Sequence, residues 1–412
     1  MNAPARRPIV NMLQEFSIPL IAGVTVAILW ANVDAESLHH FVDAPLLGSL
    51  SLHFLTNDVL MALFFGLAAK EITESCLPGG ALHSVRAVIN PVFATLGGVA
   101  GPALVFFGWV AFTGDASIAN GWGIPTATDI AMGWLVARLV FGPGHPAVQF
   151  LVLLAVLDDG IGLAIIAVFY PDPLHPVNVQ MLGLVAGAMG VAFAMRRARV
   201  QSFWPYVLVP GVMSWFGFHE AHLHPALALV PIVPFMPGPS HDAGLFVDED
   251  AMTHVVHRDP LNRFEHVFKL PVDFGLFAFG LANAGVAFSG LGNATIAVFV
   301  ALLVGKTFGV LGMGLLAREL GFPLPRGVDA KSLAVVGMVA GIGLTVALFL
   351  AGAAYTDPSL QGAAKMGALF SIAAAPLAFA MAKVLGVRRA DAGTGAAAGV
   401  ADEDPSPSQA RA

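Results

Sequence analysis

Two adjacent carboxylates, Asp158 and Asp159, lie inside a stretch of residues 147–170 that contains no other charged residue. This stretch is long enough to cross a bilayer, because about 20 apolar residues span the hydrocarbon core. An ionised carboxylate at that depth costs on the order of 3 kcal/mol or more, and two adjacent carboxylates also repel each other. Carboxylates in membrane segments usually line a water-filled path and meet cations or protons. The pair therefore predicts an ion transporter.

Two more charges lie within apolar segments. Asp129 follows residues 124–128, in which a proline and two threonines interrupt a helix. Proline removes a backbone donor, and an opened helix leaves carbonyl and amide groups free to contact an ion. Lys306 lies deep in the apolar run of residues 296–316. The structural alternative for this lysine is a side chain that extends to the cytoplasmic face.

A second interruption occurs at Gly341 and Gly343, and the order of these features is informative. A broken segment precedes the aspartate helix in one half of the chain, and the Lys306 segment precedes a glycine-interrupted segment in the other. Interrupted segments in corresponding halves indicate an inverted-repeat transporter with a site at the membrane midplane. We expect the broken helices to cross, with Asp129 offsetting their positive ends and Lys306 their negative ends. For the glycines, close helix packing is the alternative explanation.

Helix geometry allows the two aspartates of the pair to have different roles. Neighbouring residues on a helix are about 100° apart, so one carboxylate can face Lys306 while the other faces a cavity. A cation that prefers oxygen ligands would compete with protons for the same carboxylates. This competition is the basis of cation/proton antiport.

The composition predicts an all-α polytopic membrane protein. Of the 412 residues, 57% are hydrophobic and 11% charged, whereas soluble domains have about 25% charged residues. No cleavage site follows the first apolar run, which we interpret as the first membrane helix. The single cysteine, Cys76, argues against an intramolecular disulfide or a thiol-based metal site. About twelve apolar segments begin near Phe16, Asp58, Ala87, Gly121, Ala147, Val179, Phe203, Leu223, Glu265, Asn293, Lys331 and Gly362.

Loop charges predict the orientation. Lys and Arg occur on alternate loops, whereas the intervening loops at residues 113–120, 170–178 and 218–224 carry none. Only Lys365 breaks the alternation. By the positive-inside rule, both termini are cytoplasmic, which requires an even number of spans. The charged loops contain Arg6, Arg7, Arg86, Arg138, Arg196, Arg197, Arg199, Arg258, Arg263, Arg318, Arg326, Lys331, Lys383, Arg388 and Arg389.

Three parts of the chain follow from these patterns. Residues 1–15 form a cytoplasmic N-terminus, residues 16–389 the membrane transporter domain, and residues 390–412 a disordered cytoplasmic tail that is rich in Ala, Gly, Asp, Ser and Pro. Between the first two spans, alternating apolar and polar residues at 44–54 predict a short extracytoplasmic β-hairpin, with an ordinary loop as the alternative.

Several motifs resemble those of the NhaA sodium/proton antiporters, in the same order and over most of the chain, from about Trp30 to Ala354. They are Asp58-Val-Leu-Met-Ala-Leu-Phe-Phe65, Ala127-Thr-Asp-Ile-Ala131, Leu157-Asp-Asp-Gly160, Leu281-Ala-Asn-Ala-Gly-Val286, Gly305-Lys306 and Gly341-Ile-Gly343. Inverted repeats are themselves a property of this family, so the symmetry described above is not independent of the resemblance.

The resemblance implies a core domain of crossing discontinuous helices, interleaved in sequence with a dimerisation domain. It implies a sodium, lithium and proton site at Asp159, Asp158, Asp129 and Thr128, with Asp158 paired to Lys306 until an ion binds. It also implies an electrogenic homodimer of the bacterial inner membrane that is activated at alkaline pH. The transported ions are its substrates, and no cofactor, nucleic acid or enzymatic activity is expected.

The resemblance to the family supports pH regulation less directly than it supports the ion site. The candidates for pH sensing are Glu71, Glu265, His266 and His224. The neighbours of Glu71 and His224 differ from the family pattern, and the spacing from His266 to the Asn-Ala-Gly-Val motif is one residue short. Asp273 adds an unexpected carboxylate.

Other functions remain open from the sequence. A sodium-coupled symporter or a pH-gated cation channel would have the same fold. An intramembrane aspartyl protease also uses two aspartates, but it needs them on two helices that face one water, and Lys306 would have no role. Seven histidines and several acidic residues crowd into residues 219–266, where pH sensing, metal binding and solvated loop residues are the alternatives.

Overall fold

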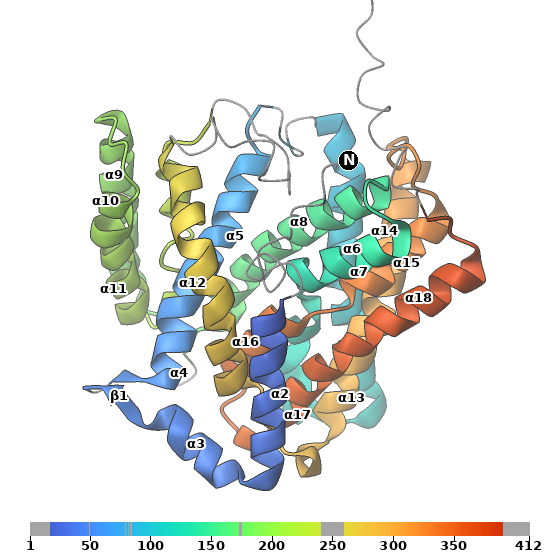
Figure 1. Cartoon of the computed structure of the whole chain (residues 1–412), viewed down its shortest axis with the longest axis horizontal. Coiled ribbons are helices and arrows are strands. Elements are labelled where there is room, and N and C mark those ends of the chain that lie inside the picture. Colours follow the sequence, from blue (N-terminus) through green and yellow to red (C-terminus); the bar gives the residue numbers. More distant parts are fainter. Residues whose placement is uncertain are drawn as a thin grey trace, which may run out of the picture.

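The computed structural model describes residues 17–48, 50–78, 80, 82, 85–172, 175–239 and 259–389. The predicted N-terminal segment and C-terminal tail therefore lie outside the described residues, as do His241, His254 and His257. The described chain is almost entirely helical (Figure 1). Its α-helices are α2 (Ile18–Val33), α3 (Ala35–Asp43), α4 (Leu52–Phe54), α5 (Met61–Ser75), α6 (Val85–Thr113), α7 (Ile130–Phe141), α8 (Pro146–Phe169), α9 (Leu182–Arg197), α10 (Trp204–Tyr206), α11 (Val212–Glu220), α12 (Pro260–Asn283), α13 (Asn293–Val300), α14 (Lys306–Glu319), α15 (Ala330–Ala340), α16 (Leu344–Ala354), α17 (Pro358–Phe370) and α18 (Ala374–Leu385).

Shorter helical segments connect several of these helices. Single π-helical segments, which have wider turns than an α-helix, lead directly into α5, α11 and α14. They are η1 (Leu55–Leu60), η4 (Val207–Gly211) and η9 (Ala301–Gly305). A 3₁₀ helix, η2 (Ala116–Thr126), precedes α7.

Six continuous helical stretches are long and apolar enough to cross a membrane. They are Leu52–Ser75, Val88–Thr113, Pro146–Phe169, Val179–Arg197, Asn293–Glu319 and Pro358–Leu385. Two further pairs pass the same test together but are bent, η2 with α7 by 61° and α15 with α16 by 50°. By length and composition, the described residues thus contain six to eight candidate spans, which agrees with a polytopic all-α membrane protein.

The prediction of a membrane helix beginning near Leu223 is wrong. This part of the chain contains only the three-residue 3₁₀ helices η5 (Pro225–Leu227) and η6 (Val233–Phe235). The segment is apolar enough to suggest a span, but it carries prolines at 225, 231, 234 and 237. Each proline removes a backbone donor and obstructs the preceding turn; helix α6 tolerates Pro91 and Pro102, which are far apart, but prolines at every third residue from 231 to 237 disrupt successive turns.

A two-stranded antiparallel sheet lies in the stretch where the hairpin was predicted. Strand β1 (Pro45–Leu47) pairs with β2 (Leu50–Ser51), with Leu47 opposite Leu50. Gly48 has φ of +66°, the left-handed conformation that a tight turn needs. The strands are shorter than predicted, because Leu52–Phe54 already forms α4.

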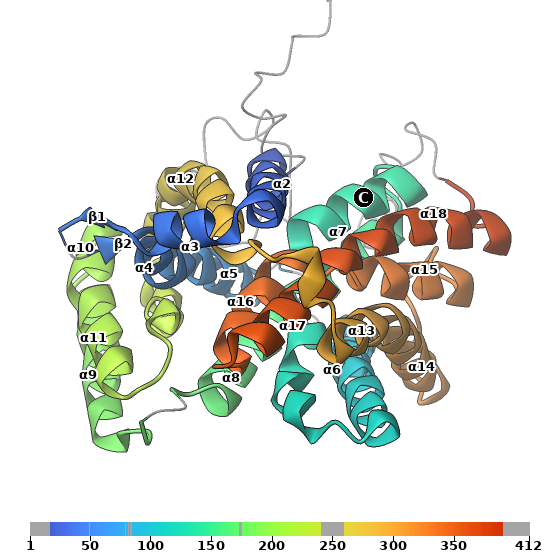
Figure 2. The same cartoon turned by 90° about the horizontal axis from the view of Figure 1, so that it is seen from below.

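The helices separate into two groups that share a central hydrophobic cluster. In Figure 1, α9, α10 and α11 lie along the left edge beside α5 and α12, whereas α6, α7, α14, α15 and α18 lie on the right. Figure 2 shows α9, α10 and α11 as a row that is set apart from the second group. Each group has its own cluster of buried apolar residues.

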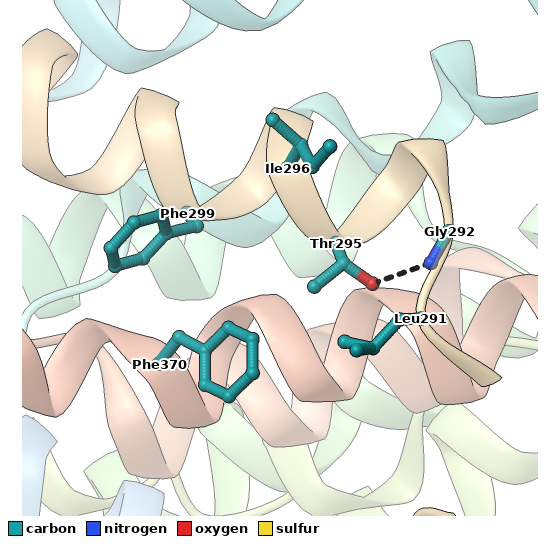
Figure 3. Close-up of a pocket in the computed structure, with 6 residues that line it drawn as sticks. All are labelled: Leu291, Gly292, Thr295, Ile296, Phe299 and Phe370. Atoms are coloured by element: carbon teal, nitrogen blue, oxygen red, sulfur yellow. Dashed lines mark hydrogen bonds between the residues drawn. The ribbon is translucent and has the colours of Figure 1, made fainter. Parts of the chain in front are cut away.

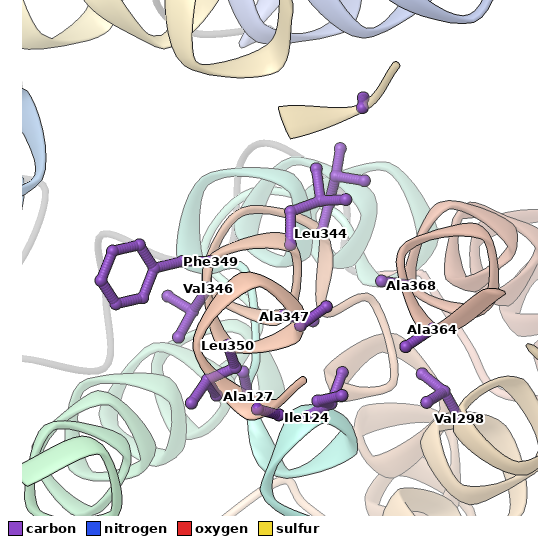
Figure 4. Close-up of a cluster of buried hydrophobic side chains, with 14 of the residues drawn as sticks. Ile124, Ala127, Val298, Leu344, Val346, Ala347, Phe349, Leu350, Ala364 and Ala368 are labelled. Atoms are coloured by element: carbon purple, nitrogen blue, oxygen red, sulfur yellow. The ribbon is translucent and has the colours of Figure 1, made fainter. Parts of the chain in front are cut away.

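The half-helix α16 lies at the centre of the shared cluster. Every residue from Leu344 to Ala351 is buried, and these side chains share one cluster with Ile124, Val298 and Ala364 from three other elements (Figure 4). A helix that is apolar all round must be surrounded by protein or lipid. The surrounding helices therefore hold α16, and with it the second chain break, in one place.

Glycines bring the helix of Lys306 into backbone contact with α6. A Cβ atom built on Gly309 would lie 2.0 Å from the carbonyl oxygen of Gly97, and one on Gly101 would lie 2.3 Å from that of Gly305. On each helix the two glycines, Gly97 and Gly101 or Gly305 and Gly309, are spaced as Gly-x-x-x-Gly, which permits close helix packing in membranes. No larger residue fits without separating the helices.

We predict that Gly309→Ala lowers the midpoint of thermal unfolding in detergent by several degrees, because its methyl group must push α14 away from α6. Gly312→Ala is the matched control on the same helix: position 312 is exposed, and a Cβ there meets no described atom within 4 Å. Since alanine favours a helix over glycine, the control should keep or raise the midpoint. Equal midpoints for the two variants would contradict this account of the contact.

Candidate functional site

The two bent pairs cross at their breaks, where only glycine fits. The amide of Asp129 donates to the carbonyl oxygen of Ile342 over 2.7 Å, so the two interrupted backbones are directly joined. A Cβ atom on Gly343 would lie 2.6 Å from the carbonyl oxygen of Ala127, and one on Gly341 would lie 2.8 Å from that of Leu302. The crossing of broken helices that the sequence predicted is thus present, and close approach explains both glycines.

Asp129 caps both C-terminal half-helices. Its Oδ1 accepts from the amide of Met132 at the start of α7, over 3.0 Å. Its Oδ2 accepts from the amide of Thr345 at the start of α16, over 3.3 Å, and from the Thr345 hydroxyl over 2.5 Å. Helix N-termini carry positive partial charge, so one buried carboxylate stabilises two of them. This is the arrangement expected for Asp129.

Lys306 binds both the aspartate helix and the first break. It is fully buried, and its Nζ pairs with Oδ2 of Asp158 and donates to the Thr128 hydroxyl over 2.8 Å. Thr128 in turn donates to the carbonyl oxygen of Ala340 at the end of α15, over 3.0 Å. Lys306 therefore contacts the negative C-terminal end of α15 only indirectly, through the hydroxyl of Thr128. Its full burial excludes a side chain that extends to the membrane surface.

Asp159 differs from its neighbour. Asp159 is 9% exposed, and its buried Oδ1, like that of Asp158, has no hydrogen-bond partner among the described residues; unlike Asp158, it forms no ion pair there. Asp158, Asp129 and Lys306 are the charges that act on it. A buried carboxylate oxygen without a donor is costly when ionised, so this oxygen is suited to a proton or a cation. The two aspartates thus have different surroundings, as helix geometry predicted.

The predicted pH-sensing residues do not form one group. Glu71 and Glu265 meet at Lys70, a buried lysine on α5 that pairs with Glu265 and with Glu74 at 2.7 Å, and donates to Glu71 over 3.3 Å. The side chain of His266 is exposed on α12.

His224 lies apart from this cluster. It precedes η5, where its Nδ1 accepts from the amide of Ala226 over 3.3 Å. Its ring lies against Phe349 of α16, with centroids 4.5 Å apart.

The structure adds residues to the site that the sequence had not assigned to it. Thr345 follows the glycine break, yet only the fold shows its bond to Asp129. Gly97, Gly101 and Gly309 hold α6 against the Lys306 helix, and their Gly-x-x-x-Gly spacing was a usable signal. Lys70 gave no signal of its own, because a lysine near a helix end is usually solvated.

A separate pocket of about 390 Å³ lies between α13 and α17 (Figure 3). Leu291, Ile296, Phe299 and Phe370 line it, and its one marked hydrogen bond joins the Gly292 amide to the Thr295 hydroxyl over 3.1 Å. An apolar lining of this kind offers no cation ligands, so we do not assign ion binding to it.

Buried charges at crossing half-helices, in a polytopic helical protein, define a membrane transporter of small ions. The model of the family described as Na+/H+ antiporter 1 matches residues 9–382. The chain belongs to this family of sodium/proton antiporters, and it is a transporter rather than an enzyme. The alternative of an intramembrane protease is therefore set aside.

Individual relatives align with this chain over nearly their whole length. A Na(+)/H(+) antiporter NhaA of Geobacter metallireducens is 58% identical over 384 residues, which cover 93% of this chain and 99% of the relative. One from Desulfitobacterium hafniense is 56% identical over 92% of this chain and 97% of the relative. One from Jannaschia is 43% identical over 92% and 98%.

We predict that Thr345→Val destabilises the protein by about 1–3 kcal/mol, because it removes the hydroxyl donor from the buried Asp129 carboxylate. Thr345→Ser keeps the hydroxyl and should stay close to the unchanged protein. Thermal unfolding in detergent measures both variants. A valine variant as stable as the serine variant would show that this bond does not hold the crossing together.

The Lys306–Asp158 pair gives a second prediction. Lys306→Met leaves a buried carboxylate without its partner and should destabilise by about 3–5 kcal/mol. Adding Asp158→Asn removes that charge, so the double variant should regain much of the loss in the same unfolding measurement. Additive effects of the two changes would mean that the two side chains are not coupled.

Proposed function

We propose that this chain exchanges sodium ions for protons at the Asp158–Asp159 pair, with Asp159 as the carboxylate that binds the transported cation. The observation that carries this assignment is that Asp159 forms no ion pair among the described residues, whereas Lys306 compensates the charge of Asp158. A proton or a sodium ion would each neutralise Asp159, and the two would exclude one another. Lithium would use the same oxygen ligands.

Further ligands for the cation would come from the crossing. Asp158 could supply an oxygen once it is released from Lys306, and Thr128 already lies within hydrogen-bond distance of that lysine. Asp129 would contribute mainly charge, because its two oxygens already accept bonds from the two half-helices. Binding of a cation would thus be coupled to the Lys306–Asp158 pair, which gives the exchange a second protonatable group.

The proposed cycle is alternating access driven by this competition. Sodium displaces protons at Asp159 from the cytoplasmic side, and protons displace sodium after the site opens to the other face. If more protons than sodium ions move per cycle, the membrane potential contributes about 2.3 kcal/mol per net charge per 100 mV. We propose such electrogenic export of sodium from a bacterial inner membrane.

The proposal also includes the architecture of the whole transporter domain, residues 16–389. The helices around the crossing would form the moving core, and the group containing α9, α10 and α11 would form the interface bundle of a homodimer. An even number of membrane crossings, inverted repeats, cytoplasmic termini and an extracytoplasmic position of the β1–β2 sheet complete it. The separate clusters of buried apolar residues support two bundles.

Regulation by pH is part of the proposal as well. Lys70 lies among Glu71, Glu74 and Glu265, which come from two helices, α5 and α12. A change in their protonation would alter the contact between these helices. The proposed pH-sensing residues are still Glu71, Glu265, His266 and His224. The shared contact with Lys70 supports the first two.

In a symporter or a cation channel of the same fold, proton flux would depend differently on the added cation. Proton flux measured in proteoliposomes, with sodium, lithium or potassium added in turn and with or without a membrane potential, separates these functions. Antiport requires that proton release depends on the added cation. A sodium current that persists without any proton movement would favour the channel.

We predict that Asp159→Asn lowers sodium-driven proton release in proteoliposomes by at least about 100-fold, because the amide neither ionises nor carries a proton in exchange. Asp357→Asn is the matched control: Asp357 is an exposed N-cap of α17, where asparagine caps equally well. The control should exchange at the unchanged rate. Robust sodium-driven proton release by the Asp159 variant would refute the assignment.

A further inference from the structure

A second pocket, of about 490 Å³ and with a more polar lining, lies where the chain leaves α8 and where α11 and α16 end. In Figure 2, the chain from α8 leads to the row of α9, α10 and α11. The pocket is lined by Asp172, His175, His219, Glu220 and His222, among other residues. This place is distinct from the crossing, because Asp172 lies beyond Phe169, the end of α8, whereas Asp158 and Asp159 lie in the middle of that helix. His224 also lines the pocket, but Asp172, His175 and His222 have no part in the exchange proposed above.

Three of these side chains converge on one point. One ligand atom of each of Asp172, His175 and His222 lies within 4.8 Å of the other two. The Nδ1 atom of His175 is 2.8 Å from Oδ2 of Asp172, and the rings of His175 and His222 stack with centroids 4.8 Å apart. Ligands of a tetrahedral zinc ion lie about 3.3 Å from each other, given metal–ligand bonds of about 2.0 Å. Small side-chain rotations would therefore close the set around an ion.

The backbone holds the two contributing segments together without help from a metal. The amide of Asp172 donates to the carbonyl oxygen of His222 over 2.9 Å, and that of Asn178 to Ala221 over 3.1 Å. His222 itself has φ of +60° in the turn after α11, a conformation uncommon for residues other than glycine. The ligands thus come from two segments that are already docked.

We propose that Asp172, His175 and His222 form a binding site for a divalent transition metal, with zinc as the ion to test. Two imidazoles and one carboxylate are the donor set of zinc sites with three protein ligands and an open fourth position. Sodium and magnesium prefer oxygen ligands alone, so the site would discriminate against both. Glu220 on the pocket wall adds negative charge that favours a cation.

The site would also act on transport, and this part rests on the proposed function. It would tie the segment after α8, the helix of Asp158 and Asp159, to the turn after α11 in the other group of helices. Alternating access requires movement between these two groups. A bound metal would therefore restrain that movement and slow sodium/proton exchange.

Calorimetric titration of the full-length, tag-free protein with zinc chloride tests the binding. We expect one tight site per chain, at least tenfold weaker in His175→Ala and in His222→Ala, and unaffected by excess magnesium. His40→Ala, which removes an exposed histidine on α3, is the matched control and should bind as the unchanged protein does. Equal zinc affinity and stoichiometry in the unchanged protein and the His175→Ala/His222→Ala double variant would overturn the site.

Proton flux in proteoliposomes, with zinc on both sides, tests the effect on transport. We expect zinc to slow exchange at least fivefold in the unchanged protein and to have no such effect in the double variant, whose rate without zinc should be normal. Tight zinc binding with unchanged flux would overturn the restraint and leave the binding site standing. Absence of exchange in the unchanged protein without zinc would instead count against the proposed function, since calorimetry does not depend on transport.

Discussion

Burial of charge at the helix crossing is the constraint on which the rest of the structure depends. Four ionisable side chains lie where water is largely excluded, and each ionised group there must be offset. Asp129 meets two helix N-termini, and Lys306 meets Asp158. The breaks in the helices are therefore part of the electrostatics, because they create the free helix ends that a buried carboxylate can stabilise.

Asp159 is the exception within this balance, and the exception is informative. Asp158 pairs with Lys306 and Asp129 meets two helix N-termini, whereas no such contact from the described residues offsets a charge on Asp159. A protein that only needed stability would gain by replacing such a group with an apolar one. Retaining it is reasonable where a small cation or a proton completes the balance during function, which agrees with a family of sodium/proton antiporters.

The sequence locates the buried charges, but not most of the contacts that surround them. Charges within apolar runs identify Asp158, Lys306 and Asp129 locally, because burial of charge is costly wherever the helices lie. The partner of each charge depends on tertiary structure, so the bonds from Thr345 to Asp129 and from Lys70 to three carboxylates appear only in three dimensions. Hydropathy also failed near Leu223, since apolar composition does not report that closely spaced prolines prevent a helix.

The π-helical turn η9, which ends at Gly305, has a consequence for how the chain can change length. It lies directly before Lys306, between two regular helical segments of one span. A π-turn holds one residue more than an α-turn, so a one-residue deletion within η9 can be absorbed by a return to regular α-helix, whereas one within α13 would rotate Lys306 by about 100° and turn it away from Asp158. The ion pair is therefore tied to residue count as well as to residue identity: in the regular helix before η9, a single insertion or deletion would separate Lys306 from Asp158.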